Sequence, residues 1–561
     1  MSAHFIVKCI DCGHPTPFLP TQLICPKCGG TWKEAEYDYK HLAHSLPLSL
    51  PGRPFDLWRY RELLPIRSPN PALSLGEGGT PLIKATNLGM MLGCPNIFIK
   101  DERQGPTASF KDRQAAVTIA ALKEAGISEL VIASTGNVAI SYSAYAARAG
   151  IKLYAFLTSL VPASKMREVA LYGTQVIKVT GSYDQAKKVA EEFAKQKNIY
   201  RDPGAMNVPT IEAMKTVGFE IAEQLTGIMG PPFASNTQHP TAPWRAPDWY
   251  IQSVSGGPGP YGVMKGYEEL LKLGMTSSLP KFGLIQSEGC APMVHAWKQN
   301  KDTAIPIQSP RTLIATLATG DPGRTYTILS DRIKNSFGGT FEDVSDKEAF
   351  RTMHILAKME GISVEPATGV AFAGLIKLIR AGVIKSDEII VVNCTGHTMP
   401  IERNILGDRW ARNVVLSSQT MEETPEEGLL SALSKVATDR FPRIAIIDDN
   451  ADVRRLIRRI LQSQGSYTIF EADNGRKGID LVMREKPNLV ILDLMMPELD
   501  GFAVMDALQN DPETADIPII VVTAKELTTE EKKRLNGHIQ TLMQKGDFMS
   551  DELMDEIRSL L

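Results

Sequence analysis

Several features that mark membrane or secreted proteins are missing from this 561-residue sequence. No uninterrupted apolar run reaches the roughly 18 residues that a membrane-spanning helix needs. The opening stretch, MSAHFIVKCIDCG, lacks the charged segment followed by an apolar one that is typical of a secretory signal peptide. Seven cysteines in so long a chain do not form the pattern of a disulfide framework. We therefore expect a cytoplasmic protein with no membrane association.

The sequence also lacks a surplus of charge of either sign. Its 61 Lys and Arg residues nearly balance 64 Asp and Glu residues. Because there is no basic excess, the composition does not indicate nucleic-acid binding. Hydrophobic residues make up 43% of the chain, as in ordinary globular proteins. The length exceeds what one core serves, so we expect about three or four domains.

Four of the seven cysteines lie close together in the first 42 residues, a segment with little apolar material of its own. Their spacing is C-x2-C-x12-C-x2-C, in which two turns each offer two thiolates to a tetrahedral Zn²⁺. A glycine follows each pair and lets the backbone turn tightly around the sulfurs. Alternatives are four unrelated buried thiols or a nucleic-acid-binding ribbon, although few Lys and Arg residues lie here. The predicted ligands of this structural zinc are Cys9, Cys12, Cys25 and Cys28.

Short apolar runs such as NIFIK, ELVIAS and WYIQSV alternate with helical stretches over most of the remaining chain. This alternation predicts parallel β-sheets covered by helices. A second pattern of the same kind starts at Arg443, after an acidic stretch that is typical of a linker. We therefore expect an α/β multidomain protein. Its predicted parts are a zinc ribbon at 1–42, a large domain at 43–415, a linker at 416–441 and a smaller domain at 442–561.

The stretch PTASFKDR, residues 106–113, raises the question of what its lysine holds. A buried lysine amine loses its proton readily and condenses with aldehydes, which is how pyridoxal phosphate is held. In VIASTGNVAISYSAYAARAG, a loop between strand and helix can present Asn137 to a ring hydroxyl, and the helix N-terminus favours an anion. The glycine-dense turn VSGGPGPYG, residues 254–262, suits a phosphate. Thr395 ends another strand, where its hydroxyl can meet a pyridine nitrogen.

Together these segments resemble threonine synthase and its relatives among the fold type II, tryptophan-synthase-β-like pyridoxal phosphate enzymes. The resemblance also rests on GEGGTPL and VNCTGH and covers about residues 1–400, because many members carry an N-terminal zinc ribbon. It implies a two-lobed domain with the cofactor between the lobes. It further implies a lyase that eliminates or replaces a group on an amino-acid substrate, and a homodimer, since relatives often pair. The implied roles are cofactor anchor and acid–base for Lys111, contact with the 3-hydroxyl for Asn137, contact with the ring nitrogen for Thr395, and phosphate binding for Ser255, Gly256, Gly257 and Gly259.

The sequence departs from the threonine synthase pattern where the substrate's distal phosphate is held. Ala205 and Thr210 stand where the family has serine and arginine, and Val138 replaces a hydroxyl residue. Pro258 and Pro260 remove two backbone N–H groups from the glycine-rich turn, whose two family asparagines are also absent. A charge-assisted contact is typically worth about 1.5–3 kcal/mol, so these changes argue against tight binding of O-phosphohomoserine. Three hypotheses stay open: a threonine-synthase-like lyase, a related enzyme that uses O-phosphoserine or deaminates serine or threonine, and a non-catalytic amino-acid sensor.

The C-terminal part carries acids directly after its apolar runs. RIAIIDDN places Asp448 and Asp449 at one predicted strand end, and NLVILDLMMPELDG places Asp493 at another. Parallel sheets gather such ends at one edge. Because carboxylates side by side repel each other unless a cation compensates, these three predict a Mg²⁺ site.

This pattern resembles the receiver domain of response regulators, a flavodoxin-like (βα)5 fold, over about 442–561. The resemblance implies a phosphorelay in which Asp493 accepts a phosphoryl group from a sensor histidine kinase or phosphotransfer protein. Gly546 and Leu542 stand where the family usually has proline and an aromatic residue. The remaining implied roles are magnesium binding by Asp448, Asp449 and Asp493, and switching by Thr523 and Lys545.

Overall fold

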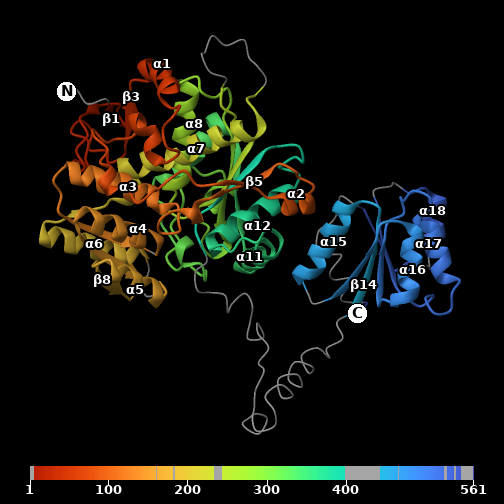
Figure 1. Ribbon diagram of the computed structural model, residues 1–561. Coiled ribbons are helices and arrows are strands. Elements are labelled where there is room, and N and C mark those ends of the chain that lie inside the picture. Colours follow the sequence, from red (N-terminus) through yellow and green to blue (C-terminus); the bar gives the residue numbers. More distant parts are fainter. Residues whose placement is uncertain are drawn as a thin grey trace, which may run out of the picture. The chain divides into compact units, whose positions relative to one another are not determined.

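The computed structural model describes most of the chain and divides it into two compact units. The first holds the N-terminal sheet and both large-domain sheets, and the second holds the C-terminal α/β part (Figure 1). The predicted linker at 416–441 and Lys545 lie outside the described residues. The described residues are 5–134, 136–158, 161–180, 183–232, 243–397, 442–464, 467–523, 527–535, 539–544, 557 and 560.

The N-terminal sheet has three antiparallel strands in the order β2-β1-β3. Buried and more exposed residues alternate along β1 and β3, as expected for strands with one face against a core. The buried face, with Phe5 and Tyr37, belongs to the same hydrophobic core as helix α8. The bounds are β1 (Phe5–Cys9), β2 (Pro15–Thr16), β3 (Lys33–Tyr37), α1 (Tyr39–Ser49) and α8 (Pro258–Lys272).

The smaller of the two large-domain sheets has four parallel strands in the order β8-β7-β6-β9. Alanine-rich α3 and α4 share one buried core with it, and α6 packs on β6 and β7 (Figure 1). The strands are β6 (Glu129–Ser134), β7 (Lys152–Thr158), β8 (Gln175–Val179) and β9 (Tyr200–Arg201). The helices are α3 (Lys111–Glu124), α4 (Asn137–Ala149), α5 (Ala163–Leu171) and α6 (Tyr183–Lys197).

The larger sheet has six strands in the order β12-β11-β10-β13-β5-β4, and only β4 at its edge runs antiparallel to its neighbour. Its central strands are buried along their whole length, which explains their continuous apolar runs. Helices α7 and α8 lie on one face and α12 on the other (Figure 1). The strands are β4 (Leu82–Lys84), β5 (Ile97–Asp101), β10 (Trp249–Ser253), β11 (Lys281–Ser287), β12 (Gly339–Val344) and β13 (Ile390–Cys394). The helices are α2 (Thr86–Leu92), α7 (Val208–Met229), α9 (Pro292–Lys298), α10 (Thr325–Arg332), α11 (Asp346–Glu360) and α12 (Pro366–Arg380).

The C-terminal sheet has five parallel strands in the order β15-β14-β16-β17-β18. In Figure 1, α15 lies on one side of this sheet and α16 and α17 on the other. Side chains of Asn474 and Asp500 cap α16 and α17 by accepting backbone N–H groups at 2.9 Å. The strands are β14 (Arg443–Ile447), β15 (Thr468–Ala472), β16 (Leu489–Leu492), β17 (Ile519–Thr523) and β18 (Thr541–Gln544). The helices are α15 (Ala451–Gln464), α16 (Gly475–Glu485), α17 (Gly501–Gln509) and α18 (Thr529–Leu535).

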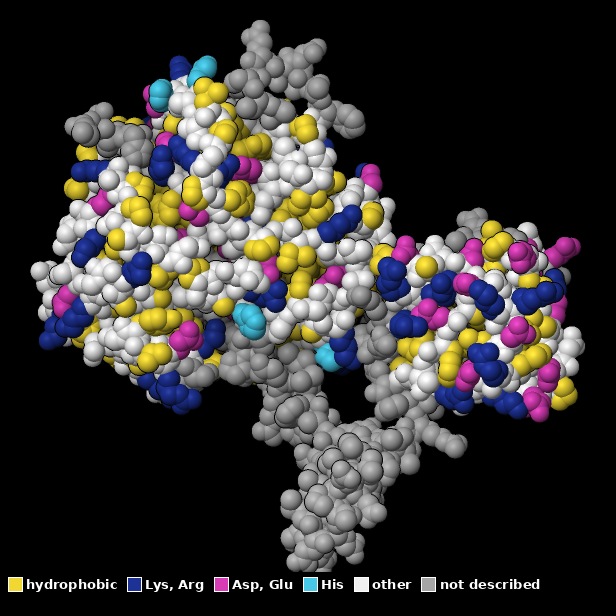
Figure 2. Space-filling view, in the orientation of Figure 1, with side chains coloured by type: hydrophobic (Ala, Val, Ile, Leu, Met, Phe, Trp, Pro, Cys, Tyr) yellow, Lys and Arg dark blue, Asp and Glu magenta, His cyan; other side chains and the backbone are white. Residues whose placement is uncertain are grey.

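The predicted α/β multidomain fold with parallel sheets is confirmed. Side chains of both signs are interspersed over the C-terminal unit in Figure 2, in agreement with the balanced composition. Among the helices in the described residues, none combines the length and the apolar character needed to cross a membrane.

Candidate functional sites

The motifs singled out in the large domain meet around one cavity. They arrive from different elements, because Lys111 starts α3, Asn137 starts α4 and Thr395 directly follows β13. The turn between β10 and α8 forms another wall of the cavity with Ser255, Gly256, Gly257 and Gly259. The structure therefore brings together every cofactor-binding residue that the sequence predicted.

Lys111 carries an unusually weak base at this cavity. Burial lowers the pKa of its ammonium group from 10.5 to about 8, against an opposing effect of the Glu365 carboxylate. Only the neutral amine is nucleophilic. Near neutral pH, the neutral fraction of the Lys111 amine is therefore larger than that of an ordinary lysine. Ala108, in the turn before the helix, has a φ of 57°, which is uncommon for a residue other than glycine.

Glu365 joins Asn137 and Thr395 across the cavity. Its Oε2 accepts a hydrogen bond from Asn137 Nδ2 at 2.7 Å, and its Oε1 accepts one from the Thr395 hydroxyl at 2.7 Å. Lys165 Nζ donates to Asn137 Oδ1 at 2.7 Å, and burial lowers the pKa of Lys165 although Glu365 and Glu168 oppose it. This network holds two predicted cofactor contacts in fixed directions.

Glu365 and Lys165 were not predicted from the sequence. Glu365 directly precedes Pro366, the first residue of α12, and is 1% exposed. An acidic residue before a helix is common, because it favours the positive end of the helix dipole. Nothing in that local pattern tells that this carboxylate turns toward Asn137, 228 residues away.

The turn at residues 255–259, here called the glycine cup, cannot carry larger side chains at two of its glycines. Gly257 has a φ of 87°, and a Cβ there would lie 2.4 Å from the Thr325 Cγ2 atom. A Cβ on Gly259 would lie 2.6 Å from Gln252 Nε2. The cup leads directly into α8, whose N-terminus favours an anion.

The chemistry of this cavity fits pyridoxal phosphate. Lys111 offers a low-pKa amine for the aldehyde, and the glycine cup with the α8 N-terminus suits the phosphate. The Ser255 hydroxyl donates to the Thr319 hydroxyl at 2.6 Å beside the cup. The Thr316 hydroxyl on the cavity wall is buried and has no hydrogen-bond partner within the described residues. A buried polar group in that state favours a ligand that would satisfy it.

A larger cleft continues from this cavity and shares Lys111 and Val138 with it. Ala205 and Thr210, the two positions that depart most from the threonine synthase pattern, line it. The cleft also has cationic side chains, three of which form ion pairs with acids. The basic residues on its wall besides Lys111 are Lys187, Lys188, Arg201 and Arg324.

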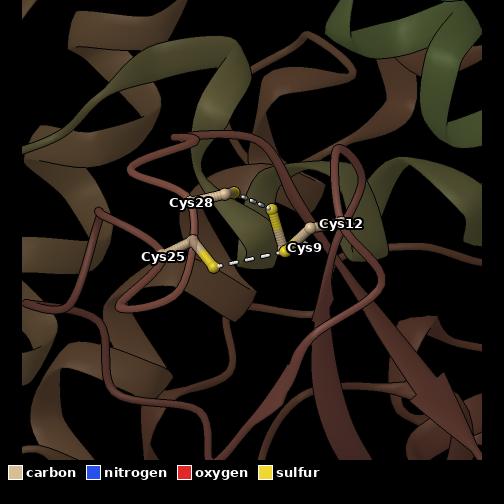
Figure 3. Close-up of side chains that lie close together, drawn as sticks. All are labelled: Cys9, Cys12, Cys25 and Cys28. Atoms are coloured by element: carbon tan, nitrogen blue, oxygen red, sulfur yellow. Dashed lines mark hydrogen bonds between the residues drawn. The ribbon is translucent and has the colours of Figure 1, made fainter.

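The four N-terminal cysteines converge on one point (Figure 3). Their sulfurs all lie within 4.8 Å of one another, with Cys9 Sγ and Cys28 Sγ 3.5 Å apart and Cys12 Sγ and Cys25 Sγ 3.7 Å apart. In a tetrahedral zinc site with Zn–S bonds of about 2.3 Å, sulfurs lie about 3.8 Å apart. The geometry of these thiols therefore fits the predicted zinc.

The acids of the C-terminal unit also converge, as the sequence predicted. One carboxylate oxygen from each of Asp448, Asp449 and Asp493 lies within 4.8 Å of the others. The pairing of β14 with β16 brings them together, and the Asp493 N–H donates to the Ile447 carbonyl at 2.9 Å. Thr523 ends the next strand and is buried. Because Asp448 and Asp493 are nearly fully buried, their charges favour a cation such as Mg²⁺.

Two family models match the chain. The family model "Pyridoxal-phosphate dependent enzyme" matches residues 73–396. The chain belongs to this family. A second model, "Response regulator receiver domain", matches residues 444–558.

Threonine synthases are prominent among the relatives of this family member. The enzyme of Methanocaldococcus jannaschii is 35% identical over 392 residues, which cover 70% of this chain and 91% of the relative. That of Methanosarcina acetivorans is 33% identical over 402 residues, covering 71% and 93%. A solved L-serine ammonia-lyase from Rhizomucor miehei is 18% identical and covers 58% of this chain and 96% of its own, with a TM-score of 0.49. The chain is a pyridoxal-phosphate-dependent lyase similar to threonine synthase and joined to a receiver domain.

Proposed function

We propose that this lyase acts on an amino acid with a leaving group on its β or γ carbon, and that phosphorylation of Asp493 regulates it. The observation that carries the proposal is the cavity in which a low-pKa Lys111 faces the glycine cup and the Asn137–Glu365–Thr395 network. The similarity to threonine synthases supports the reaction class.

Each residue of the cavity has a proposed task. When bound, pyridoxal phosphate supplies an electron sink for negative charge at the substrate's α carbon. Lys111 anchors the cofactor and, with its pKa of about 8, takes up and returns protons at the substrate carbons near neutral pH. The Asn137 and Thr395 side chains orient the ring, and the glycine cup holds the phosphate.

For the substrate, the relatives and the cleft support different members of one class. The threonine synthase relatives favour O-phosphohomoserine. Val138, Ala205 and Thr210 on the cleft wall offer no cation for a distal phosphate, which favours a related amino acid such as O-phosphoserine, serine or threonine.

Phosphate release from O-phosphohomoserine, with threonine assayed in the same tube, tests the substrate. Release with threonine formed assigns threonine synthesis to this chain, and other cleft residues such as Lys187, Lys188 or Arg201 then hold the phosphate. No release from cofactor-loaded protein removes that substrate and moves the search to serine, threonine and O-phosphoserine. The Lys111→Ala variant serves as the blank.

A second candidate function is an amino-acid sensor in which ligand binding biases the receiver. The receiver domain in the same chain favours it. The two functions differ in turnover, since a sensor would change the absorbance of the bound cofactor with an amino acid but release no product. Coupling is reciprocal in both cases, so ligand must change the stability of the phosphorylated state by the free energy with which phosphorylation changes ligand affinity.

For the other two sites, we propose a structural zinc on the four cysteines and a Mg²⁺ ion on the three acids. The receiver domain implies a phosphotransfer partner, for which we propose a sensor histidine kinase. Thr523, at the end of β17, is the proposed switch hydroxyl, and Lys545 is its proposed partner. We also propose a homodimer, to be tested by the mass of the protein in solution.

A further inference from the structure

Two helices enclose the glycine cup and set its width. Helix α8 starts at Pro258, inside the cup, and α10 starts at Thr325, whose Cγ2 faces Gly257. A Cβ on Gly257 would also lie 3.2 Å from Leu329 in α10. The cup is therefore a close contact between the two helices, and its shape depends on how they are held together.

The N-terminal sheet holds the first turn of α8. Glu34, on β3, accepts a hydrogen bond from the Tyr261 hydroxyl at 2.7 Å. Trp32 lies against the same tyrosine, with ring centroids 6.3 Å apart. Tyr261 is fully buried and is only two residues from Gly259. A displacement of Glu34 would therefore also displace the residues of the glycine cup.

The sheet and the turn after β1 also hold α10, at both of its ends. Glu34 Oε1 accepts from the Arg332 guanidinium at 2.6 Å, so one carboxylate bridges α8 and α10. Arg332 also lies over the Tyr261 ring, with its Cζ 4.9 Å from the ring centroid. At the other end, Asp11 forms an ion pair with Arg324, the residue directly before α10.

Asp11 connects these contacts with α8 and α10 to the cysteine cluster. It lies between Cys9 and Cys12 in the sequence, and a Cβ on Gly30 would lie 2.2 Å from its Oδ2 and 3.3 Å from Cys28 Sγ. The Asp11 carboxylate is thus packed into the turn that carries the cysteines. Its place follows from the fold that zinc stabilises.

We propose that the zinc ribbon positions the cofactor's phosphate, with Asp11 and Glu34 as positioning residues that hold α8 and α10 around the glycine cup. This inference rests on the proposed zinc and cofactor sites. Neither residue lines the cofactor cavity, so their effect must pass through the two helices. Substitution of Asp11 or Glu34 should therefore weaken binding of the cofactor's phosphate more than binding of its aldehyde end at Lys111.

The test compares two ligands in the full-length protein freed of cofactor: pyridoxal phosphate and pyridoxal, which lacks the phosphate. Affinities are measured by visible absorbance for the wild type, Glu34→Gln and Asp11→Asn. Glu36→Gln is the matched control, because Glu36 lies on the same strand as Glu34 but pairs with Lys8 of β1 and not with α8 or α10. Zinc content and thermal melting are measured on each preparation.

We expect Glu34→Gln to weaken pyridoxal phosphate binding about tenfold while pyridoxal affinity stays within about twofold, and Asp11→Asn to act in the same direction. Glu36→Gln should leave both affinities unchanged. An equal loss for both ligands, or no loss for either, would overturn the proposal. If Glu34→Gln does not fold, the partly exposed Asp11→Asn decides by the same ratio.

The same measurements on the wild-type protein test the proposed function independently of the role of the ribbon. Wild-type protein that binds neither ligand contradicts the cofactor site itself, and wild-type protein without zinc contradicts the metal assignment. The ratio of the affinities for pyridoxal phosphate and pyridoxal in the variants tests only the role of the ribbon.

Discussion

The cavity around Lys111 and the acid cluster around Asp493 both lie where parallel β-strands end, yet they suit ligands of opposite charge. The first gathers the N-termini of helices, a weakly basic amine and neutral hydroxyls beside one carboxylate, Glu365, and its helix N-termini suit an anionic cofactor. The second gathers three carboxylates, two of them buried, which suit a cation. The same position in a sheet is therefore adapted to opposite ligands by the residues that follow the strands.

The largest expected effect is the loss of the cavity's nucleophile. Lys111→Ala should remove the visible absorbance of the bound cofactor and lower turnover by about a thousandfold or more, because the proposed anchor and acid–base group is lost. Absorbance spectra and product assays measure both. Lys123→Ala, at the far end of α3, is the control and should keep both signals. A cofactor band that survives in Lys111→Ala would contradict the assignment.

Asp493→Ala removes the key side chain of the acid cluster, as Lys111→Ala does in the cavity. This change should abolish labelling of the protein by acetyl phosphate, since the proposed phosphoacceptor is gone. Asp452→Ala is a matched control, because Asp452 is an exposed aspartate of the same unit paired with Arg455. Mass spectrometry of the intact protein measures the added phosphoryl group. Labelling of Asp493→Ala at the wild-type level would move the phosphosite elsewhere.

Removal of one zinc ligand should act on the ribbon. Cys28→Ser is expected to lower the zinc content from about one per chain to well below that, because structural sites need all four ligands. Metal analysis of the purified protein measures it. Cys290→Ser, a buried cysteine outside the cluster, should keep its zinc. Full zinc in Cys28→Ser would exclude the four-cysteine site.

The protonation state of Lys111 in the cavity can be tested by varying the pH. With a Lys111 pKa of about 8, the neutral fraction of the amine rises about tenfold between pH 7 and pH 9. Cofactor uptake by the apoprotein should therefore accelerate with rising pH through about 8 and level off above it. Stopped-flow absorbance measures the rate. A rate that keeps rising toward the ordinary lysine pKa of 10.5 would show that burial does not weaken this base.

The smallest expected effect concerns Glu365, whose negative charge raises the pKa of Lys111. Glu365→Gln keeps a hydrogen-bond acceptor but removes that charge, so the midpoint of the uptake profile should move to lower pH. The shift is measured against the wild type in the same series of buffers. Glu360→Gln, another acid of the chain that does not reach the cavity, should leave the midpoint in place. A shift to higher pH in Glu365→Gln would contradict the electrostatic account.

Local patterns were sufficient for the features that depend on neighbours in sequence. The buried strands appear as apolar runs, the cysteine spacing predicts the converging sulfurs, and the glycines before α8 predict the cup. Contacts between distant segments were not predictable. Glu365 reaches Asn137, and Glu34 reaches Arg332 across 298 residues, through packing that no local pattern encodes. The domain boundaries and the role of Lys545 stay predictions.

The most direct test of the central claim is to locate the cofactor on the chain. Cofactor-loaded protein is reduced with borohydride, digested and mapped by mass spectrometry. The account predicts a pyridoxyl phosphate mass on the peptide that contains Lys111. The label on Lys165, the neighbouring amine that contacts Asn137, or on no lysine of the cavity would contradict it.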